Sequence, residues 1–411
     1  MSTAVSSGVF RQDATVIGLV GFAHATSHFF HLMLPPLFPW LMTEYSLSFT
    51  QVGALMSVFF AVSGIGQALA GFLVDRWGAH RVLCAGVALL ATSGILVAAA
   101  PALWGLYVAA FVAGLGNSIF HPADFSLLNH RVSQSRLGHA FSVHGLSGNL
   151  GWATGPIVMT AAASSFGWRT AGVVAALIGF AALSGLWWKR DELSNALVGA
   201  SRDTGKRARG SDVTVSGLLK LPLVWFAFSF FFLSTLVLAA LQNFAPSLMR
   251  SLYGLSLAAG TSALTAYLIG GAAGVAMGGF LTGDNRNEER IVGLAFLTSA
   301  VLALILAFSL TPRWAVIGVM ALMGCGVGLA GPSRDMLVRK CAAARLGTGA
   351  FGRIYGLVYS GLDVGLAAGP LIFGMMMDAG KPRLVFIGIG LSFVLATIAA
   401  QAMARQVKSP A

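Results

Sequence analysis

Three histidines stand four and three residues apart in the first long apolar stretch of the chain. His24, His28 and His31 fall on one helix face, within about 60° of one another at about 100° per residue. Imidazole can carry a proton near neutral pH, bind a metal, or hydrogen-bond to a neighbouring helix. The three histidines are predicted to line a proton or anion path. Two alternatives stay open: a binding site for a metal or metal chelate, and hydrogen bonds to neighbouring helices. We expect no metal ligand, because the sequence offers no obvious carboxylate or thiol partner.

A second polar helix face follows further along the chain. Asn117, His121 and Asp124 are spaced by four and three residues, on a helix that Pro122 is expected to kink. His121 and Asp124 are within hydrogen-bonding reach of each other and could hold one proton whose release depends on conformation. A structural pair against another helix is the alternative. His144, in the next apolar stretch, adds a further ionisable group.

One carboxylate stands almost alone in the second half of the chain. Asp363 lies near the middle of the otherwise apolar segment 349–377, with no basic residue on the same face within a turn. A carboxyl group there is protonated when dry and ionised when wet, as proton coupling requires. The alternative pairs it with His24 or His28 across a cavity. Asp363 is the leading candidate for a proton-coupling residue.

Charged residues also follow the stretch 314–333. Asp335 and Arg339 form an i,i+4 pair, which predicts a gate at the cytoplasmic end of a helix, and a solvated helix end is the alternative. Arg334 lies deeper, and its guanidinium group suits a phosphonate or carboxylate of a substrate.

Composition determines what kind of elements position these side chains. Of 411 residues, 26 are Lys or Arg and 14 are Asp or Glu, so 10% are charged while 56% are hydrophobic. Mean hydropathy is +0.80, and a soluble domain carries about 25% charged residues. A soluble enzyme is therefore excluded. The net charge of +12 is spread in short clusters, which argues against nucleic acid, and the three cysteines form no disulfide or zinc spacing.

Long stretches free of charge predict membrane helices, each of which needs about 20 apolar residues. Ten such stretches occur: 14–43, 45–74, 82–123, 137–168, 170–188, 221–249, 251–283, 291–312, 314–333 and 384–404. The stretch 82–123 holds two helices with Pro101 at the turn, and 349–377 adds another, giving twelve. With a cytoplasmic N-terminus, 21 of the 26 Lys and Arg residues face the cytoplasm, so both termini are expected there.

An internal repeat divides these helices into two halves. The Gly, Gly and Pro of GLGNSIFHP at 114–122 recur in GCGVGLAGP at 324–332, at an offset of 210. Matches around Arg136 and Gly71 occur at offsets of 208 to 210. Two parallel six-helix repeats related by an axis along the membrane normal form a known transporter plan. The expected parts are an N-terminal six-helix half at 1–188, a cytoplasmic linker at 189–220 and a C-terminal six-helix half at 221–411.

At this point the motifs show a family resemblance. The segment GFLVDRWGAHR at 71–81 resembles the G-x-L-x-D-R-x-G-x-x-R signature of the major facilitator superfamily almost position for position. The resemblance covers the whole chain and implies that family's all-α fold. The glycine-rich segment 145–156 resembles the motif of proton antiporters, but Val158 and Met159 replace two usual glycines. The finer pattern, including IFHPADFS at 119–126, looks most like the fosmidomycin-resistance-like branch.

The signature loop is expected to act as a gate. Its proposed members are Gly71, Asp75, Arg76, Gly78 and Arg81. A neighbouring helix N-terminus would attract the carboxylate of Asp75, and Arg76 and Arg81 could pair with acidic groups across the interface between the halves. A simple positive-inside anchor is the alternative.

These observations favour a secondary active transporter working by alternating access. We expect proton-coupled efflux, by antiport, of a small organic molecule or drug, as in antibiotic resistance; the alternative is a proton-coupled uptake symporter for an organic anion or metal chelate. A sensor that has lost transport is disfavoured by the intact signature loop. No catalytic triad, metal cluster or phosphate loop is readable, so neither enzymatic activity nor a cofactor is expected. The resemblance implies a monomeric, multi-pass protein of the bacterial inner membrane whose partners are substrate, protons and lipid, and not nucleic acid.

Overall fold

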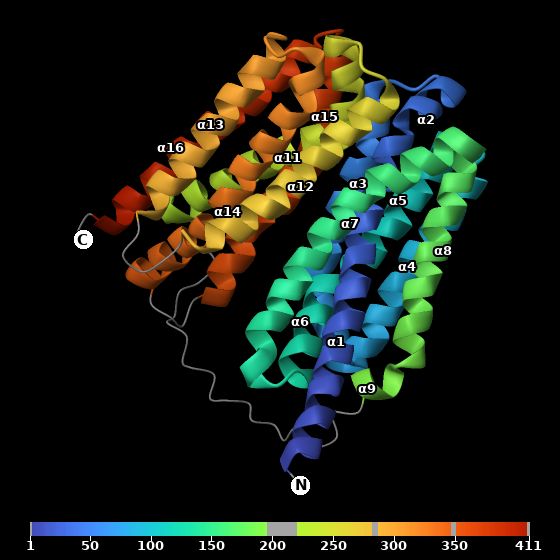
Figure 1. The fold of residues 1–411 in the computed structure, drawn as a ribbon, viewed down its shortest axis with the longest axis vertical. Helices are drawn as coiled ribbons and strands as arrows, with labels where there is room; N and C mark the ends of the chain where they lie inside the picture. The colour runs from blue at the N-terminus through green and yellow to red at the C-terminus, as the bar shows by residue number, and fades with distance from the viewer. Residues whose placement is uncertain (1, 195–219, 282–286, 347–350, 409–411) are drawn as a thin grey trace. The chain divides into compact units, whose positions relative to one another are not determined.

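The computed structural model describes residues 2–194, 220–281, 287–346 and 351–408, and the part of the chain so described is helical and contains no β-strand (Figure 1). It divides into two compact units, residues 1–47 with 58–202, and residues 48–57 with 203–411. Most of the linker expected at 189–220 lies outside the described residues. Asp284, which belongs to the repeat's second copy of the signature loop, lies outside them too.

The first unit contains helices that cover the expected N-terminal half. They are α1 (Ser2–His31), α2 (Phe38–Tyr45), α3 (Phe49–Trp77) from residue 58 onward, α4 (Ala79–Ala99), α5 (Leu103–Asn117), α6 (Phe120–Arg131), α7 (Leu137–Phe166), α8 (Trp168–Trp188) and α9 (Arg190–Ser194). Helix α1 packs along α7, and α4 packs along both α5 and α8. The chain turns between α4 and α5 at Pro101, because proline cannot donate a helical hydrogen bond.

Helices α5 and α6 together form one interrupted pass. Helix α5 ends at Asn117 and α6 begins at Phe120, so the break falls just before Pro122. Pro122 has no N–H to bond to the carbonyl four residues earlier, and its ring crowds that carbonyl. The break places Asn117 at the end of one helix and His121 in the first turn of the next.

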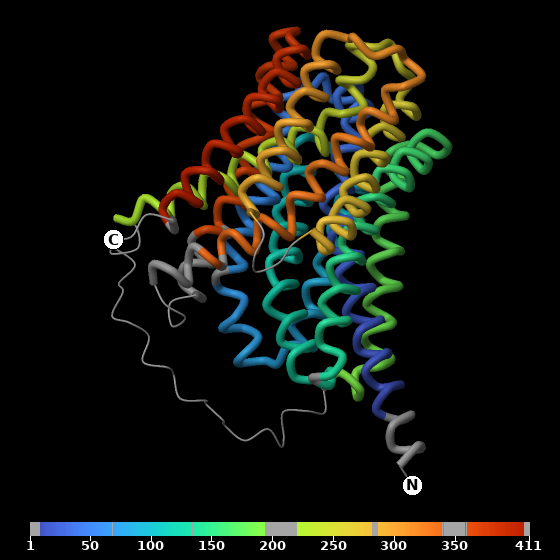
Figure 2. The backbone as a smooth tube through the Cα atoms, turned by 60° about the vertical axis from the view of Figure 1, so that its left-hand side comes forward, coloured from blue at the N-terminus to red at the C-terminus, as the bar shows by residue number. Residues whose placement is uncertain are grey.

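The second unit contains six long helices. They are α11 (Pro222–Tyr253), α12 (Leu257–Gly279), α13 (Glu288–Ala307), α14 (Val316–Leu346), α15 (Phe351–Asp378) and α16 (Pro382–Lys408). Helix α13 lies beside α16, and α12 beside α14 (Figures 1 and 2). Helix α11 begins with proline, whose fixed φ suits the first turn, and ends at Gly254 with a φ of 64°.

Small residues bring α12 and α14 into backbone contact. A Cβ atom added at Gly324 would overlap the carbonyl oxygen of Tyr267, and one added at Gly328 would overlap the carbonyl oxygen of Gly271. Membrane helices gain no hydrophobic free energy by leaving lipid, so close van der Waals packing between backbones has to hold them together. Glycine at these two positions is therefore a packing requirement.

The start of α3 belongs with the second unit. Its N-terminal N–H groups are capped by Asp378, at the end of α15, which accepts hydrogen bonds from the backbone nitrogens of Phe49 and Thr50 at 2.6 and 2.9 Å. The Thr50 hydroxyl donates to the same carboxylate at 2.5 Å. A carboxylate at a helix N-terminus satisfies free N–H groups and complements the helix dipole.

Eleven helical segments among the described residues are long and apolar enough to cross a bilayer. They account for eleven of the twelve passes expected from the sequence, with α5 and α6 counted as one pass. Helix α7, in the predicted stretch 137–168, is not among the eleven. Its 30 residues are sufficient in length, but its first half carries two histidines, serines and an asparagine, which lower its hydropathy.

Candidate functional site

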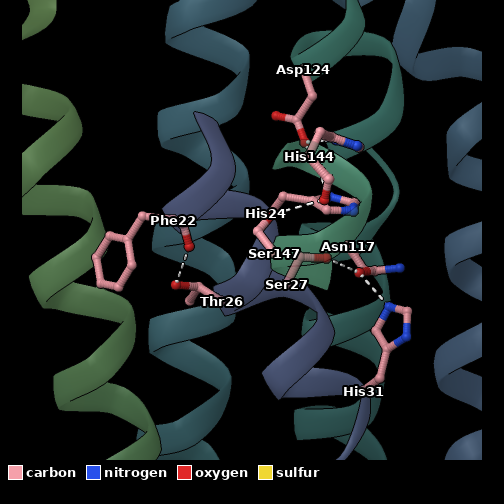
Figure 3. A network of polar contacts seen from close by, with 9 residues as sticks. All are labelled: Phe22, His24, Thr26, Ser27, His31, Asn117, Asp124, His144 and Ser147. Atoms are coloured by element: carbon pink, nitrogen blue, oxygen red, sulfur yellow. Dashed lines mark hydrogen bonds and ion pairs between the residues drawn. The ribbon is translucent and has the colours of Figure 1, made fainter. Parts of the chain in front are cut away.

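One fully buried polar group of the first unit is a carboxylate held between α1, α6 and α7. Asp124, on α6, is 0% exposed. Its Oδ2 atom accepts a hydrogen bond from Nε2 of His144 on α7 at 3.0 Å and lies 3.2 Å from Nδ1 of His24 on α1. Figure 3 shows these three side chains converging at one end of a longer polar network.

His121 completes this group from the same helix as Asp124. The ring nitrogens of His24, His121 and His144 offer one atom each within 4.8 Å of one another, and His121 is the exposed member. We call His24, His121, Asp124 and His144 the imidazole–carboxylate cluster. The rings of His24 and His144 stack at a centroid distance of 3.6 Å.

The cluster corrects the pairing expected from the sequence. Asp124 was expected to share a proton with His121, three residues earlier. Within the described chain its hydrogen bond instead goes to His144, and its second close contact is His24. Imidazoles of two neighbouring helices reach the same carboxylate oxygen, and residue spacing within one helix cannot reveal such a contact.

A row of imidazoles leads from the cluster along α1. The ring centroids of His24 and His28 lie 4.4 Å apart, and those of His28 and His31 lie 4.8 Å apart. Trp152, on α7, stacks on His28 at 4.4 Å and donates its Nε1–H to Nδ1 of His31 at 3.1 Å. The structure thus brings the three histidines of the stripe together.

Asn117 is the junction at the far end of this row (Figure 3). Its Oδ1 atom accepts from the Ser27 hydroxyl at 2.6 Å and lies 2.9 Å from Nε2 of His31, while its Nδ2 donates to Ser63 Oγ at 2.8 Å. His31 therefore accepts from Trp152 at Nδ1 and donates at Nε2, an arrangement of the neutral imidazole. Asn117 joins α1, α3 and α5 through side chains alone.

Removing this junction is expected to destabilise the first unit. Asn117→Leu leaves buried polar atoms of Ser27, His31 and Ser63 without their partner, at a cost of about 2–3 kcal/mol. Thermal unfolding of the purified protein should show a clear loss of stability. Asn129→Leu is the matched control, because Asn129 is exposed on α6 and bonds only to a backbone carbonyl of its own helix. Equal unfolding of the two variants would contradict the role of Asn117.

The signature loop borders a separate hollow of about 350 Å³ in the first unit. Asp75, Arg76, Gly78 and Arg81 are among its lining residues, and Gly71 lies earlier on α3. Gly78 has a φ of 86° in the turn between α3 and α4, a conformation that strongly favours glycine. The pairing of Arg76 and Arg81 with acidic groups of the other half stays a prediction.

Three candidate residues of the second unit have side chains that the structure describes: Arg334, Asp335 and Asp363. Arg334 pairs with its neighbour Asp335 at 2.8 Å and lies over the Phe231 ring at 5.0 Å. The side chain of Arg339, the expected partner of Asp335, lies outside the described residues. Asp363, on α15, is half-buried, and within the described chain no charged or hydrogen-bonding group acts on its carboxyl.

Sequence reasoning missed several polar groups that the structure shows buried or bonded. Glu288, at the start of α13, is 1% exposed and lies 3.4 Å from Nζ of Lys340 on α14. Asp13, on α1, is 3% exposed and pairs with Arg136 at 2.8 Å. For Glu288 and Asp13, the sequence signal that could have indicated burial was a charged residue at the edge of an apolar stretch. For Trp152, whose indole contacts His28 and His31, the sequence signal was a single tryptophan within a glycine-rich helix.

Apolar helices of membrane-spanning length that enclose ionisable side chains define a polytopic membrane protein. Residues 20–352 match the Major Facilitator Superfamily, and the chain belongs to this superfamily of membrane transporters. The resemblance seen in the signature loop is thereby confirmed.

Relatives extend over nearly the full length of the chain. The fosmidomycin resistance protein of Escherichia coli (strain K12) is 25% identical over 93% of this chain and 91% of its own. The gallate transporter of Pseudomonas putida is 25% identical over 89% of each chain. The fold is similar to the crystal structure of a bacterial homolog to the human lysosomal transporter Spinster. The TM-score is 0.73, at 14% identity over 96% of both chains.

Proposed function

We propose that this protein is a proton-coupled secondary transporter that exports a small organic molecule by alternating access. The observation that carries the proposal is a fully buried carboxylate, Asp124, surrounded by imidazoles inside a unit of apolar helices. Ionisable groups at membrane depth are costly, and they mark substrate and ion pathways. A purely structural bundle of this composition has no need of them.

The proposal includes twelve membrane passes with both termini in the cytoplasm. Helix α7 has 30 residues, a length of about 45 Å, against a hydrocarbon core of about 30 Å. One of its polar residues, His144, is buried against Asp124 of α6 and His24 of α1 in the cluster, so low hydropathy is compatible with a spanning helix. The bias of 21 among 26 basic residues supports the orientation. We further propose a monomer in a bacterial inner membrane.

Proton coupling is assigned to Asp363. Its half-buried carboxyl has no partner among the described groups, so nothing nearby stabilises its negative charge when water is absent. Opening toward water favours ionisation, and closure favours the neutral acid. A carboxyl group with this behaviour takes up a proton on one side of the membrane and releases it on the other.

Two relatives support different directions of transport. We propose export as the first candidate and uptake as the second. The fosmidomycin resistance protein matches over 91% of its length, and its name supports drug efflux. The gallate transporter supports the second candidate, an uptake symporter for an organic anion or metal chelate. Arg334, placed over an aromatic ring, offers a guanidinium group to such an anion. The signature loop is proposed to gate the cycle in either case.

Proton flux in inverted vesicles distinguishes the two candidates. Vesicles with an acidified lumen are treated in turn with fosmidomycin, gallate and hydrophobic cations, with EDTA present throughout. Export predicts that at least one compound releases protons from vesicles containing the protein and not from protein-free vesicles. If no compound does so, while a compound accumulates in right-side-out vesicles, the protein is an importer and the export proposal is wrong.

A further inference from the structure

We propose that the imidazole–carboxylate cluster is a binding site for one divalent transition-metal ion of the Zn²⁺ class. The four ligands are His24, His121, Asp124 and His144. This inference concerns binding alone, and it depends on neither the direction nor the organic substrate of transport. It reverses our expectation from the sequence, in which the histidines had no carboxylate partner for a metal.

The two spacings around the carboxylate oxygen of Asp124 already suit one ion. Tetrahedral Zn²⁺ with bonds of about 2.0–2.1 Å places neighbouring ligand atoms about 3.3–3.4 Å apart. Oδ2 of Asp124 lies 3.0 Å from Nε2 of His144 and 3.2 Å from Nδ1 of His24. The stacked rings of these two histidines hold both nitrogens beside the same oxygen.

Two buried atoms of the cluster have no hydrogen-bond partner. Nδ1 of His24 is one of them, although Asp124 is only 3.2 Å away, because the geometry does not suit a hydrogen bond. Oδ1 of Asp124 is the other. Buried polar groups in native structures are nearly always satisfied, so each exception calls for an explanation. A bound cation satisfies the nitrogen and the carboxylate together.

The electrostatics of the site favour a cation of charge two. Among the described groups, the ion-pair partners of Asp124 are His24 and His144, and no lysine or arginine pairs with it. An ionised carboxylate in an apolar interior is costly unless a cation pairs with it. A divalent ion bound to Asp124 supplies that positive charge.

His121 provides both the fourth ligand and the entry path. It is exposed, and it stands in the first turn of α6, directly before Pro122. The ligand nitrogens of the three histidines lie within 4.8 Å of one another, against about 3.4 Å between neighbouring ligand atoms in a tetrahedral site, so His121 has to move toward the other three ligands. A side-chain rotation at an exposed position accomplishes such a shift, so an ion can enter along His121 and be capped by it.

The ligand set selects the class of ion. Three imidazole nitrogens and one carboxylate oxygen suit Zn²⁺, Co²⁺ and Ni²⁺. Mg²⁺ and Ca²⁺ prefer sets of oxygen ligands and waters. We therefore expect neither Mg²⁺ nor Ca²⁺ to compete for the cluster.

The test measures metal binding to the purified full-length protein without a polyhistidine tag. Zn²⁺ is titrated against a fluorescent chelator, and Co²⁺ is titrated while its visible absorption is recorded. We expect one tight ion per chain, the intense absorption of tetrahedral Co²⁺, and no competition from Mg²⁺ or Ca²⁺. His121→Asn should weaken Zn²⁺ binding at least about 100-fold, since loss of an outer-shell partner alone costs 10–100-fold.

His130→Asn is the matched control, because His130 is also an exposed histidine of α6 and lies outside the cluster. It should bind Zn²⁺ as the wild type does. Equal affinities in the two variants, or weak octahedral Co²⁺ absorption in the wild type, would overturn the proposal. The Co²⁺ spectrum needs no variant, so a folding defect cannot hide the answer. The vesicle experiment contains EDTA, so failure of metal binding leaves its outcome unaffected.

Discussion

Asp363→Asn is expected to reduce substrate-driven proton release from acidified inverted vesicles to the level of protein-free vesicles. Asparagine keeps the shape of the side chain but cannot take up or release a proton in the relevant range. Substrate should still bind, since the amide fills the same space. Substrate exchange without a proton gradient, measured with labelled compound, should therefore persist in this variant while gradient-driven accumulation is lost.

The control for this variant is Asp191→Asn. Asp191, on α9, has a side chain that is 81% exposed, and its contact with Arg190 is 4.0 Å long, so its neutralisation should leave proton release unchanged. Full proton release by Asp363→Asn would remove the carboxyl group from the coupling mechanism. Loss of both exchange and accumulation would indicate a substrate-binding role in its place.

Gly328→Ala is expected to destabilise the second unit by about 1–3 kcal/mol, the usual cost of overpacking. The added methyl group overlaps the carbonyl oxygen of Gly271, which is backbone and cannot rotate away. Helices α12 and α14 must then separate and lose their close contact. Denaturant titration in detergent, followed by circular dichroism or by chymotrypsin susceptibility, measures the loss.

Gly318→Ala tests whether the effect comes from packing. Gly318 lies on the same helix, and a Cβ atom there has open space around it, so alanine should preserve stability or improve it slightly. A similar loss in both variants would point to helix flexibility, and not to contact with α12, as the reason for glycine at 328.

Much of the fold could be predicted from the sequence, because the membrane requires long apolar segments. Uncharged stretches located the helices, and Pro122 indicated the break between α5 and α6. Helix α7 shows that hydropathy alone can fail to detect an expected membrane pass. Its polar first half contributes His144 to the cluster, and the same composition keeps α7 out of the set of apolar spans.

The site was harder to predict, for a physical reason. Helical periodicity states which residues of one helix share a face, so the row from His24 to His31 was visible in the spacing. It cannot state which neighbouring helix that face contacts. The bond of Asp124 to His144 joins residues 20 positions apart on different helices, and the indole of Trp152 reaches His31 across 121 positions.

The grouping of the first turns of α3 with the second unit has a consequence for half-molecules. A fragment cut within 195–219 and expressed from there to the C-terminus lacks residues 48–57, which complete its compact unit. The carboxylate of Asp378 would then face water without the N–H groups that it caps. A cut within 195–219 therefore does not divide the chain into two autonomous pieces, and complementation between separately made halves requires one half to supply part of the other.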